Sequence, residues 1–459
     1  MNYKTETIIQ VKRSTFPYFL LLMVLFATFS SAQNPIIMDQ FTADPTARVF
    51  NGKVYLYPSH DVPCGEGQGF VGFCMPDYHV FSSENLTDWK DHGVILSHNT
   101  VPWVEPDSYR MWAPECVYKE GKYYYYFPAE APEKINGKGR RIGVAIGDKP
   151  EGPFIPEPNY IAGIYGIDPT VFIAKDGKAY IYWANDRVIY GAQLKPNMLE
   201  LATLPVPIKI KGIGNGKFIE GPFVFERNGQ YYLTFPYIPE TIEQLVYSIG
   251  TNPLGPFDYK GIIMKESPTK CYTNHQSIVD YKGQSYLFYH HNDLSPNSDK
   301  RRSVKAEMLF FNPDGTIQEV FPSLRGVGIS RAESQIQIDR YSEKSETGIS
   351  SSFVDSLNTF KGWKVTLNQK NAWVRYNKVD FSNKALKKLK VMAKNSLGGS
   401  FEIRVKALDG PLIGTVNLKK SADWGISISK LTNQTVGLND VFIISTSNNP
   451  IEIDWITFE

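Results

Sequence analysis

Five polar residues occupy the same position in five copies of a repeated sequence pattern. Each lies just ahead of a short strand, a turn with glycine and a second strand rich in tyrosine. The five residues are Asp44, Glu115, Asp168, Glu220 and His275. Carboxyl groups that meet in pairs can divide acid–base work, because one gives a proton while the other takes one. The pattern therefore indicates an acid–base site, provided that the fold brings these side chains together.

The repeat also predicts the elements that position these residues. Its turn glycines follow one another at intervals of 52 to 69 residues, at Gly52, Gly121, Gly177, Gly229 and Gly283. This interval is about the length of a four-stranded propeller blade, so we expect a five-bladed β-propeller. Equivalent positions of the innermost strands then converge at one end of the axis. Because like charges placed so close split their pKa values, the arrangement favours an active site over a structural ring.

The start of the chain has the pattern of an export signal. Basic residues precede an apolar run from about Phe16 to Phe29, and small residues follow it up to Gln33. We expect residues 1–32 to be a signal peptide, with an uncleaved anchor as the alternative. The protein is then periplasmic or extracellular and has no membrane partner after cleavage.

The rest of the chain reads as strands and turns, so the predicted fold class is all-β. We expect the propeller over residues 33–335 and a linker over the polar stretch 336–352. Residues 353–459 contain short alternating strands, which predict a β-sandwich of the jelly-roll type. Most of the many aromatic residues are expected to pack between strands.

The composition gives no sign of a nucleic-acid, membrane or metal partner. A formal net charge of +2 is too small an excess of positive charge to indicate binding to nucleic acid or to an acidic membrane surface. The four cysteines have no metal-site spacing, but Cys64 and Cys74 flank a glycine-rich loop and could pair in an exported protein. We expect a monomer whose chemistry requires no cofactor.

Three of the five positions lie in recognisable motifs, Ala43-Asp-Pro45, Ile167-Asp-Pro-Thr170 and Glu220-Gly-Pro222. Occurring together and in this order over roughly residues 35–330, they resemble glycoside hydrolase family 43. The resemblance implies an inverting mechanism with Asp44 as general base, Glu220 as general acid and Asp168 raising the pKa of that acid. The expected fold agrees with these roles. Blades one and four face each other across the channel mouth, which separates the base from the acid, and Asp168 lies on the blade beside Glu220, where its charge raises the pKa of that acid.

Further pocket residues follow from the same resemblance. Trp112 is a sugar-stacking candidate, Glu115 matches a pocket-lining position and Arg302 matches an arginine that contacts the sugar. His275 matches a histidine at the axis that often binds calcium, so a structural Ca²⁺ is expected there. Four residues at strand ends are additional pocket candidates: His60, Asp61, His290 and His291.

The C-terminal unit resembles carbohydrate-binding module family 6 in Gly398-Gly-Ser-Phe401, in Gly410-Pro-Leu-Ile413 and in Ile453-Asp-Trp455. Trp424 matches one of its sugar-binding aromatics, and Asn448 or Asn449 matches its asparagine. Leu367 stands where the second aromatic is expected, and Asp355 lies where that family has paired glutamates of a calcium site. A packed companion domain without sugar binding is the alternative.

The expected function is an exported inverting exo-glycosidase that releases arabinofuranose or xylose from plant cell-wall polysaccharide (arabinoxylan, arabinan or xylan). Alternatives within the class are an endo-acting arabinanase or xylanase and a galactan-directed exo-glycosidase. Whether the enzyme acts in the exo or endo mode depends on whether the loops Cys64–Asp77 and His98–Tyr109 close the pocket. A retaining β-fructosidase is disfavoured, because its Asn-Asp-Pro-Asn signature is missing. The alternative of another class is a non-catalytic carbohydrate-binding protein.

Overall fold

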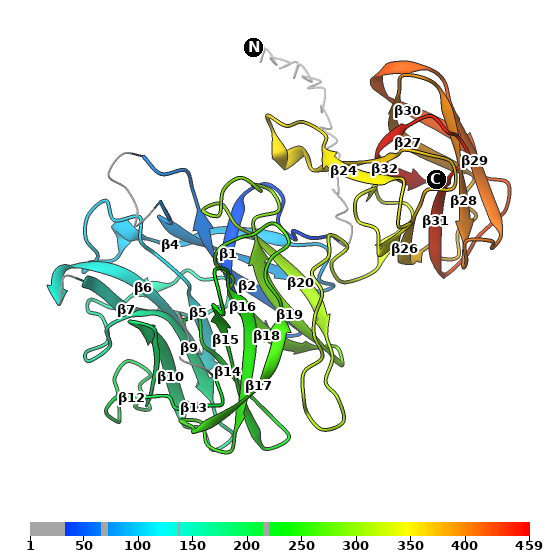
Figure 1. Cartoon of the computed structure of the whole chain (residues 1–459). Helices are drawn as coiled ribbons and strands as arrows, with labels where there is room; N and C mark the ends of the chain where they lie inside the picture. Colours follow the sequence, from blue (N-terminus) through cyan, green and yellow to red (C-terminus); the bar gives the residue numbers. More distant parts are fainter. Residues whose placement is uncertain (1–32, 66–71, 136–137, 214–219) are drawn as a thin grey trace, which may run out of the picture.

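A computed structural model describes residues 33–65, 72–135, 138–213 and 220–459. It contains two all-β units, a propeller followed by a sandwich (Figure 1). The predicted signal peptide, residues 1–32, lies outside the described residues. Within those residues, no helix combines the length and apolar character needed to cross a membrane.

The first unit is a five-bladed propeller, which confirms the prediction. Blade one contains β1 (Phe41–Phe50), β2 (Lys53–Asp61), β3 (Asp77–Ser83) and β4 (Lys90–Ser97), followed by the short 3₁₀ helix η1 (His98–Thr100). Blade two contains β5 (Glu115–Lys119), β6 (Lys122–Ile135), β7 (Lys138–Gly147) and β8 (Ile155–Pro156). Blade three contains β9 (Ile167–Ile173), β10 (Ala179–Asn185), β11 (Val188–Gln193) and β12 (Val206–Pro207).

The last two blades differ from the others in strand number. Blade four contains β14 (Phe223–Arg227), β15 (Gln230–Tyr237), β16 (Gln244–Gly250) and β17 (Phe257–Met264), and β13 (Ile210–Lys211) joins its edge in parallel. Blade five contains β18 (Gln276–Tyr281), β19 (Gln284–His291) and β20 (Ser303–Leu309). The first strands of the blades, β1, β5, β9, β14 and β18, contact one another in a closed ring around the axis.

The repeated glycines make tight turns between the first two strands of each blade. In four of these hairpins both turn residues have positive φ, as in Asn51-Gly52 (50° and 75°) and Asn228-Gly229 (52° and 76°). Two-residue turns of this kind match the right-handed twist of antiparallel strands and favour glycine at the second position. The turn chemistry therefore explains why the glycine spacing predicted the blades.

The segment from Asn34 to the start of β1 adds further contacts between blades one and five, where the ring closes. The Ile36 N–H donates to the Val304 carbonyl (2.9 Å), and the Thr42 N–H donates to the Arg302 carbonyl (3.0 Å). Asn34 is fully buried, and its side chain bonds to both the carbonyl and the N–H of Ala306 (3.1 and 2.9 Å). This segment of the chain thus lies along β20 of blade five.

The second unit is a sandwich of two sheets, as predicted. One sheet contains β21 (Ser330–Arg331), β23 (Glu343–Lys344), β26 (Trp373–Asp380), β28 (Gly399–Val405), β29 (Leu412–Leu418) and β31 (Leu438–Ser445). The other contains β22 (Ile336–Gln337), β24 (Ile349–Phe353), β25 (Trp363–Leu367), β27 (Lys388–Asn395), β30 (Ser421–Lys430) and β32 (Ile451–Phe458). The 3₁₀ helix η2 (Thr359–Lys361) precedes β25. Buried and half-exposed residues alternate along β27, as expected for strands with one face on the core.

The segment expected to be a linker, residues 336–352, belongs instead to the sandwich. Ile336 and Ile338 lie in its core, and the short strands β22, β23 and β24 pair with β32, β26 and β25. Asp339 and Arg340 of this segment are buried, but the polar residues from Ser342 to Ser352 are exposed or half-exposed on short edge strands, which gives this part the composition of a linker.

The two units touch through an arginine and a pair of aromatic rings. Arg340 is almost fully buried, and it donates to the Leu324 carbonyl of the propeller (3.1 Å) while packing over the Trp363 ring (5.1 Å). The rings of Phe41 and Phe360 lie 4.8 Å apart across the same boundary. These contacts hold the sandwich against the side of the propeller where β1 begins.

Candidate active site

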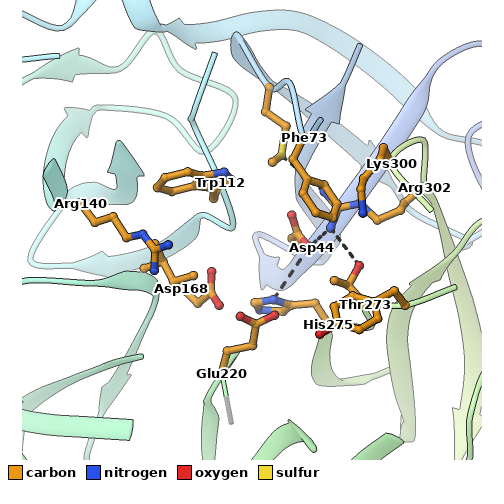
Figure 2. A pocket seen from close by; sticks show the side chains of 13 residues that line it. Asp44, Phe73, Trp112, Arg140, Asp168, Glu220, Thr273, His275, Lys300 and Arg302 are labelled. Atoms are coloured by element: carbon orange, nitrogen blue, oxygen red, sulfur yellow. Dashed lines mark hydrogen bonds and ion pairs between the residues drawn. The ribbon is translucent and has the colours of Figure 1, made fainter. Parts of the chain in front are cut away.

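A cavity of about 350 Å³ lies at the end of the propeller axis where the first strands begin. Four of the five repeat positions line it: Asp44, Asp168, Glu220 and His275. Figure 2 shows the side chains of these residues pointing toward one another from different blades. The convergence predicted from the repeat is therefore present for four of its five members.

Asp44 and Asp168 share an uncommon backbone conformation. Each has positive φ (45° and 56°), and each precedes a proline. The pairing of β1 with β2 shifts register between Ala43 and Thr46, around Asp44. Such bulges re-aim side chains, and left-handed non-glycine residues often occur at functional sites. The local sequence thus turns both carboxylates toward the axis instead of the blade interior.

The surroundings of Asp44 favour its charged form. Arg302 Nη1 donates to Oδ1 (2.8 Å), Ser59 Oγ donates to Oδ2 (2.8 Å), and the Asp44 N–H donates to His290 Nδ1 (3.0 Å). Burial alone would raise the pKa of Asp44, but the Arg302 charge and these contacts outweigh it, so the pKa lies below its ordinary value. Asp44 is therefore a carboxylate at neutral pH.

The surroundings of Glu220 have the opposite effect. Burial raises the pKa of Glu220 well above its ordinary value, and repulsion from Glu243 and Asp168 raises it further. Burial and the charge of Asp44 raise the pKa of Asp168 to about 7. Asp168 Oδ2 also accepts the N–H of Gly221 (3.2 Å), which ties it to the residue that follows Glu220. One carboxylate and one protonated carboxyl group thus face the same cavity.

The comparisons with known proteins agree with this geometry. Residues 32–317 match the model of glycosyl hydrolases family 43, and residues 341–459 match the carbohydrate binding module (family 6). The chain belongs to glycosyl hydrolases family 43. Within this family 43 hydrolase the first match covers the propeller and the second covers the sandwich.

Its relatives cover either the propeller alone or both units. A xylosidase/arabinosidase 43A of Humicola insolens is 38% identical over 330 residues, which are 62% of this chain and 98% of that protein. A β-xylosidase/α-arabinofuranosidase from a compost metagenome, solved with xylotriose in a calcium-free form, is 36% identical (TM-score 0.56; 63% and 98% of the two chains). A Bacillus subtilis arabinoxylan arabinofuranohydrolase shares the two-unit fold (TM-score 0.55, 23% identity, 94% and 99%).

In the family 43 hydrolase, Asp61 lies outside the cavity in which it was predicted, whereas Arg302 lines that cavity and contacts two carboxylates. Arg302 lines the cavity, but its Nε and Nη2 donate to the two carboxylate oxygens of Asp61 (2.9 and 2.8 Å) while Nη1 donates to Asp44. Asp61 is buried behind the arginine and does not line the cavity. Asp61 thus anchors the guanidinium that keeps Asp44 charged.

The upper walls of the cavity are aromatic and basic. Trp112 lines one side as predicted, with the Arg140 guanidinium 5.7 Å from its ring centre. Phe73 lines the other side, with Lys300 Nζ 4.1 Å from its ring centre (Figure 2). Aromatic faces suit the apolar faces of a sugar, while cationic groups suit its hydroxyls.

Two other predicted pocket residues lie away from the cavity. Glu115 is fully buried deeper in the channel, where it bonds to Arg48 Nε (2.9 Å) and Thr170 Oγ1 (2.8 Å). His60 pairs with Asp77 (2.7 Å) on the sheet formed by β2 and β3. Neither side chain lines the cavity.

The histidines of blade five lie close to Asp44. His275 Nδ1 is 4.0 Å from Asp44 Oδ1, and burial lowers the pKa of His275 to about 4, so the ring is neutral. His290 holds the Asp44 backbone, and the neighbouring His291 is fully buried. These two histidines support the site from behind.

The donor set around His275 does not match a dedicated calcium site. Calcium takes six to eight oxygen ligands, whereas Asp44, the carboxylate near His275, is already bound to Arg302 and Ser59. Among the described residues, the group of three or more His, Cys, Asp or Glu side chains close enough to hold a metal lies elsewhere, on blade one. The protein side chains at His275 therefore give little support for the expected Ca²⁺.

Sequence reasoning missed Glu243, which is fully buried between β15 and β16 and accepts the N–H of Asn274 (2.5 Å). Burial raises the pKa of Glu243 to about 8. Phe73, Met75 and Arg140 were also missed. All four lie outside the repeated position, so no local pattern marked them.

The predicted cysteine pair and the candidate sugar-binding residues of the sandwich do not line the cavity. Cys64 and Cys74 form a disulfide across the loop that carries Phe73. Trp424 is half-buried on β30, with Lys364 Nζ 6.0 Å from its ring centre. Asn448 is exposed in the turn before β32, and Asn449 donates to the Gly398 carbonyl (2.8 Å).

Proposed function

We propose that this family 43 hydrolase cleaves terminal xylose or arabinofuranose residues from plant polysaccharide with inversion of configuration. The observation that carries the proposal is the opposed pKa shift of Asp44 and Glu220 in one cavity. Two titratable groups whose surroundings push their pKa values apart are a signature of an acid–base pair. An inverting enzyme needs such a pair about 6.5–9.5 Å apart, with water between the base and the sugar.

In the proposed mechanism each acid has one task. Glu220 gives its proton to the glycosidic oxygen as the bond from that oxygen to the anomeric carbon breaks. Asp44 takes a proton from a water molecule whose oxygen bonds to the anomeric carbon from the opposite face. Asp168 holds the Gly221 N–H and, by its charge, helps to keep Glu220 protonated. The two carboxyl groups exchange protonation states and are reset through solvent.

The names of the relatives support the choice of sugars. The Humicola insolens protein is named a xylosidase/arabinosidase, and a Xanthomonas citri relative has been crystallised with xylotriose. Phe73 and Trp112 on opposite walls favour a pocket for a chain end, hence exo action. Endo-acting arabinanase or xylanase activity and galactan-directed activity stay as alternatives, since one relative is named a β-D-galactofuranosidase and another an endo-arabinanase.

The proposal treats calcium and the export of the protein separately from the acid–base chemistry. One relative is described in a calcium-free form, but no step in this chain is assigned to calcium.

We infer export from the basic and apolar pattern of residues 1–32, and the Cys64–Cys74 disulfide suits an oxidising compartment. Mass spectrometry of the secreted protein should give a mature N-terminus at Gln33, whereas a retained leader would contradict export.

Proton NMR of the first product tests the chemistry. With p-nitrophenyl β-D-xyloside or α-L-arabinofuranoside as substrate, we expect the inverted anomer to appear first. Glu220→Gln and Asp44→Asn should each lower kcat by about 10²-fold or more, since general acid–base groups contribute about that much. Glu226→Gln is the matched control, because Glu226 lies on the same blade and pairs with Lys175 instead of lining the cavity. A retained anomer, or full activity in either acid variant, would contradict the mechanism.

A further inference from the structure

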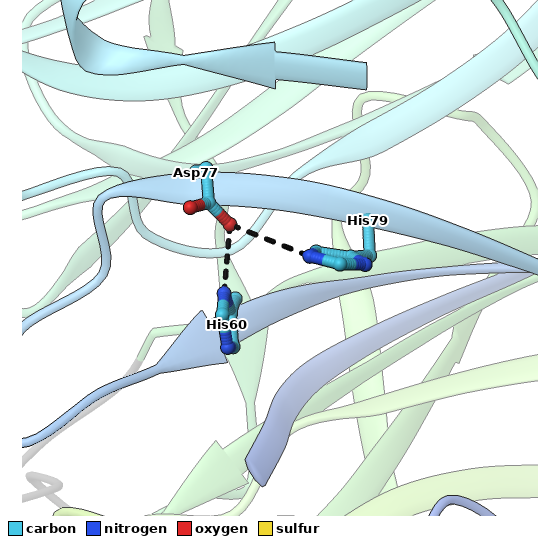
Figure 3. Close-up of side chains that lie close together, drawn as sticks. All are labelled: His60, Asp77 and His79. Atoms are coloured by element: carbon cyan, nitrogen blue, oxygen red, sulfur yellow. Dashed lines mark hydrogen bonds and ion pairs between the residues drawn. The ribbon is translucent and has the colours of Figure 1, made fainter. Parts of the chain in front are cut away.

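A second cluster of titratable side chains lies on blade one, outside the catalytic cavity. His60 comes from the end of β2, and Asp77 and His79 come from the start of β3 (Figure 3). His60 Nδ1 is 2.7 Å and His79 Nε2 is 3.9 Å from Asp77 Oδ1. The two imidazole rings are nearly perpendicular, with centres 5.0 Å apart. One ligand atom from each residue thus lies within 4.8 Å of the other two.

The next strand fixes the orientation of His79. Both carboxylate oxygens of Asp91 lie 3.1 Å from His79 Nδ1, and Asp91 is itself held by Gln40 Nε2 (3.1 Å) and the Gly93 N–H (2.7 Å). A carboxylate at Nδ1 keeps the proton on that nitrogen and leaves the lone pair on Nε2. That lone pair then faces the carboxylate oxygen of Asp77. Two electron-rich atoms placed in this way call for a cation between them.

We propose that His60, Asp77 and His79 bind a divalent transition metal, with zinc as the preferred ion. Two imidazole nitrogens and one carboxylate oxygen suit zinc better than calcium or magnesium, which prefer oxygen ligands. Side-chain exposures of 20%, 18% and 15% leave room for water as a fourth ligand. Asp91 completes the arrangement as the carboxylate that orients a ligating histidine.

Binding requires the three ligand atoms, which lie within 4.8 Å of one another, to draw together by movement of the side chains. Zinc bonds of about 2.0–2.1 Å in a tetrahedron place neighbouring ligand atoms about 3.3 Å apart. The 2.7 Å contact between His60 and Asp77 must open slightly, and the 3.9 Å gap to His79 must close by a similar amount. The metal takes the place of the hydrogen atom between His60 Nδ1 and Asp77, and the neutral imidazole of His60 keeps its one proton on Nε2. Because the ligands come from paired strands, the sheet holds them in place.

The proposed metal site lies at the base of a loop that forms part of the cavity wall. β2 and β3 enclose residues 62–76, the loop that contains the Cys64–Cys74 disulfide. Phe73 and Met75 of this loop line the cavity. A metal bound by His60, Asp77 and His79 therefore clamps the base of the loop that forms one wall of the pocket.

Calorimetric titration of the metal-free full chain with zinc chloride tests this proposal. We expect one zinc ion per chain to bind through the cluster, and a higher Tm in the presence of zinc. His79→Gln should weaken binding at least about 100-fold, and Asp91→Asn should weaken it about 10–100-fold. His92→Gln is the control, because His92 lies on β4 of the same sheet and pairs with Ser82.

Activity on an aryl glycoside confirms that each variant is folded before it is titrated. Zinc binding at unchanged affinity in both His79→Gln and Asp91→Asn would overturn the proposal, because the ion would then lie elsewhere, for example among the catalytic acids. Failure of the wild-type chain to bind zinc below millimolar concentrations would also overturn it. Loss of binding in His92→Gln to the same degree as in His79→Gln would assign the effect to the sheet instead of the cluster.

Discussion

At the scale of single residues, the site works because three buried groups set the charge of two others. Arg302 holds Asp44 in its carboxylate form, while Glu243 and Asp168 help to hold Glu220 protonated. Neither of the two proposed catalytic residues would behave in this way in water, where both ionise near pH 4. The proposed division of work between base and acid therefore comes from their neighbours, and changes at those neighbours should appear in the pH dependence.

Glu243→Gln should move the alkaline limb of the kcat/KM profile to lower pH, by about one pH unit. The raised pKa of Glu220 means that the acid is active below that pKa and is lost as the pH rises through it. A neutral amide removes the repulsion from Glu243, so the pKa of Glu220 falls and activity is lost earlier. A pH–rate profile on an aryl xyloside measures the shift. An alkaline limb that stays in place would show that Glu243 does not act on Glu220.

Arg302→Lys should move the acidic limb of the same profile to higher pH and lower kcat/KM at least about tenfold, because a charge-assisted hydrogen bond contributes about 1.5–3 kcal/mol. The lowered pKa of Asp44 means that the base is active above that pKa and is lost as the pH falls through it. A lysine cannot hold Asp61 with a two-pronged contact and reach Asp44 as well. Arg301→Lys, an exposed neighbour, should leave both limbs unchanged.

At the scale of the elements, strand starts and tight turns aim the side chains that line the cavity. Gly221 shows how little room remains beside them. Its φ is +50°, and a Cβ at this position would lie 3.0 Å from His275 Nδ1 and from Pro236 Cδ. Its N–H binds Asp168, and its carbonyl accepts a bond from Gln276 (2.9 Å). The turn after Glu220 is therefore fixed on both sides.

Gly221→Ala should lower kcat about tenfold or more and destabilise the fold by about 1–2 kcal/mol, from strain at positive φ and pressure on His275. Kinetics and thermal unfolding of the purified variant measure both effects. Gly229→Ala is the control for strain alone, since its φ is +76° but nothing lies within 4 Å of the added Cβ. Equal activity of the two variants would mean that the space beside His275 is not needed for catalysis.

The sequence predicted these elements where the signal was local. Turn glycines and alternating strands recur in every blade, so the five blades and four of the five axial residues could be anticipated. Glu115 shares the repeat position but pairs with Arg48, a partner that only the closed ring brings near. Glu243 lies between two strands with no repeated neighbour, so it carries no pattern. The edge strands of residues 336–352 are polar because they face solvent, and their composition therefore resembled a linker.

At the scale of the whole molecule, the propeller and the sandwich are joined by a buried contact. Arg340 lies among Leu324, Trp363 and Asp339, with its Nε 3.0 Å from Asp339 Oδ2. Both charged side chains are almost fully buried. The pair thus links the first core strands of the sandwich to the end of the propeller.

Arg340→Ala should destabilise the sandwich by about 3–5 kcal/mol, because Asp339 is left buried without its partner. Calorimetry should then resolve a lower-melting transition, while kcat/KM on aryl glycosides at 25 °C stays unchanged, since the cavity lies within the propeller. Arg375→Ala removes a half-exposed pair with Glu343 and should cost no more than about 1 kcal/mol. Loss of catalysis in Arg340→Ala would show that the sandwich supports the cavity directly.

The closure of the ring near Asn34 also has a consequence for biosynthesis. Asn34 bonds to Ala306, 272 positions later in the chain, and Ile36 and Thr42 bond to Val304 of the same strand. The earliest and latest parts of the propeller to leave the ribosome must therefore meet before the circle is complete. Contacts of such long range make folding slow and leave strand edges unpaired in the meantime. A growing chain of this enzyme cannot finish its catalytic unit until blade five has been synthesised.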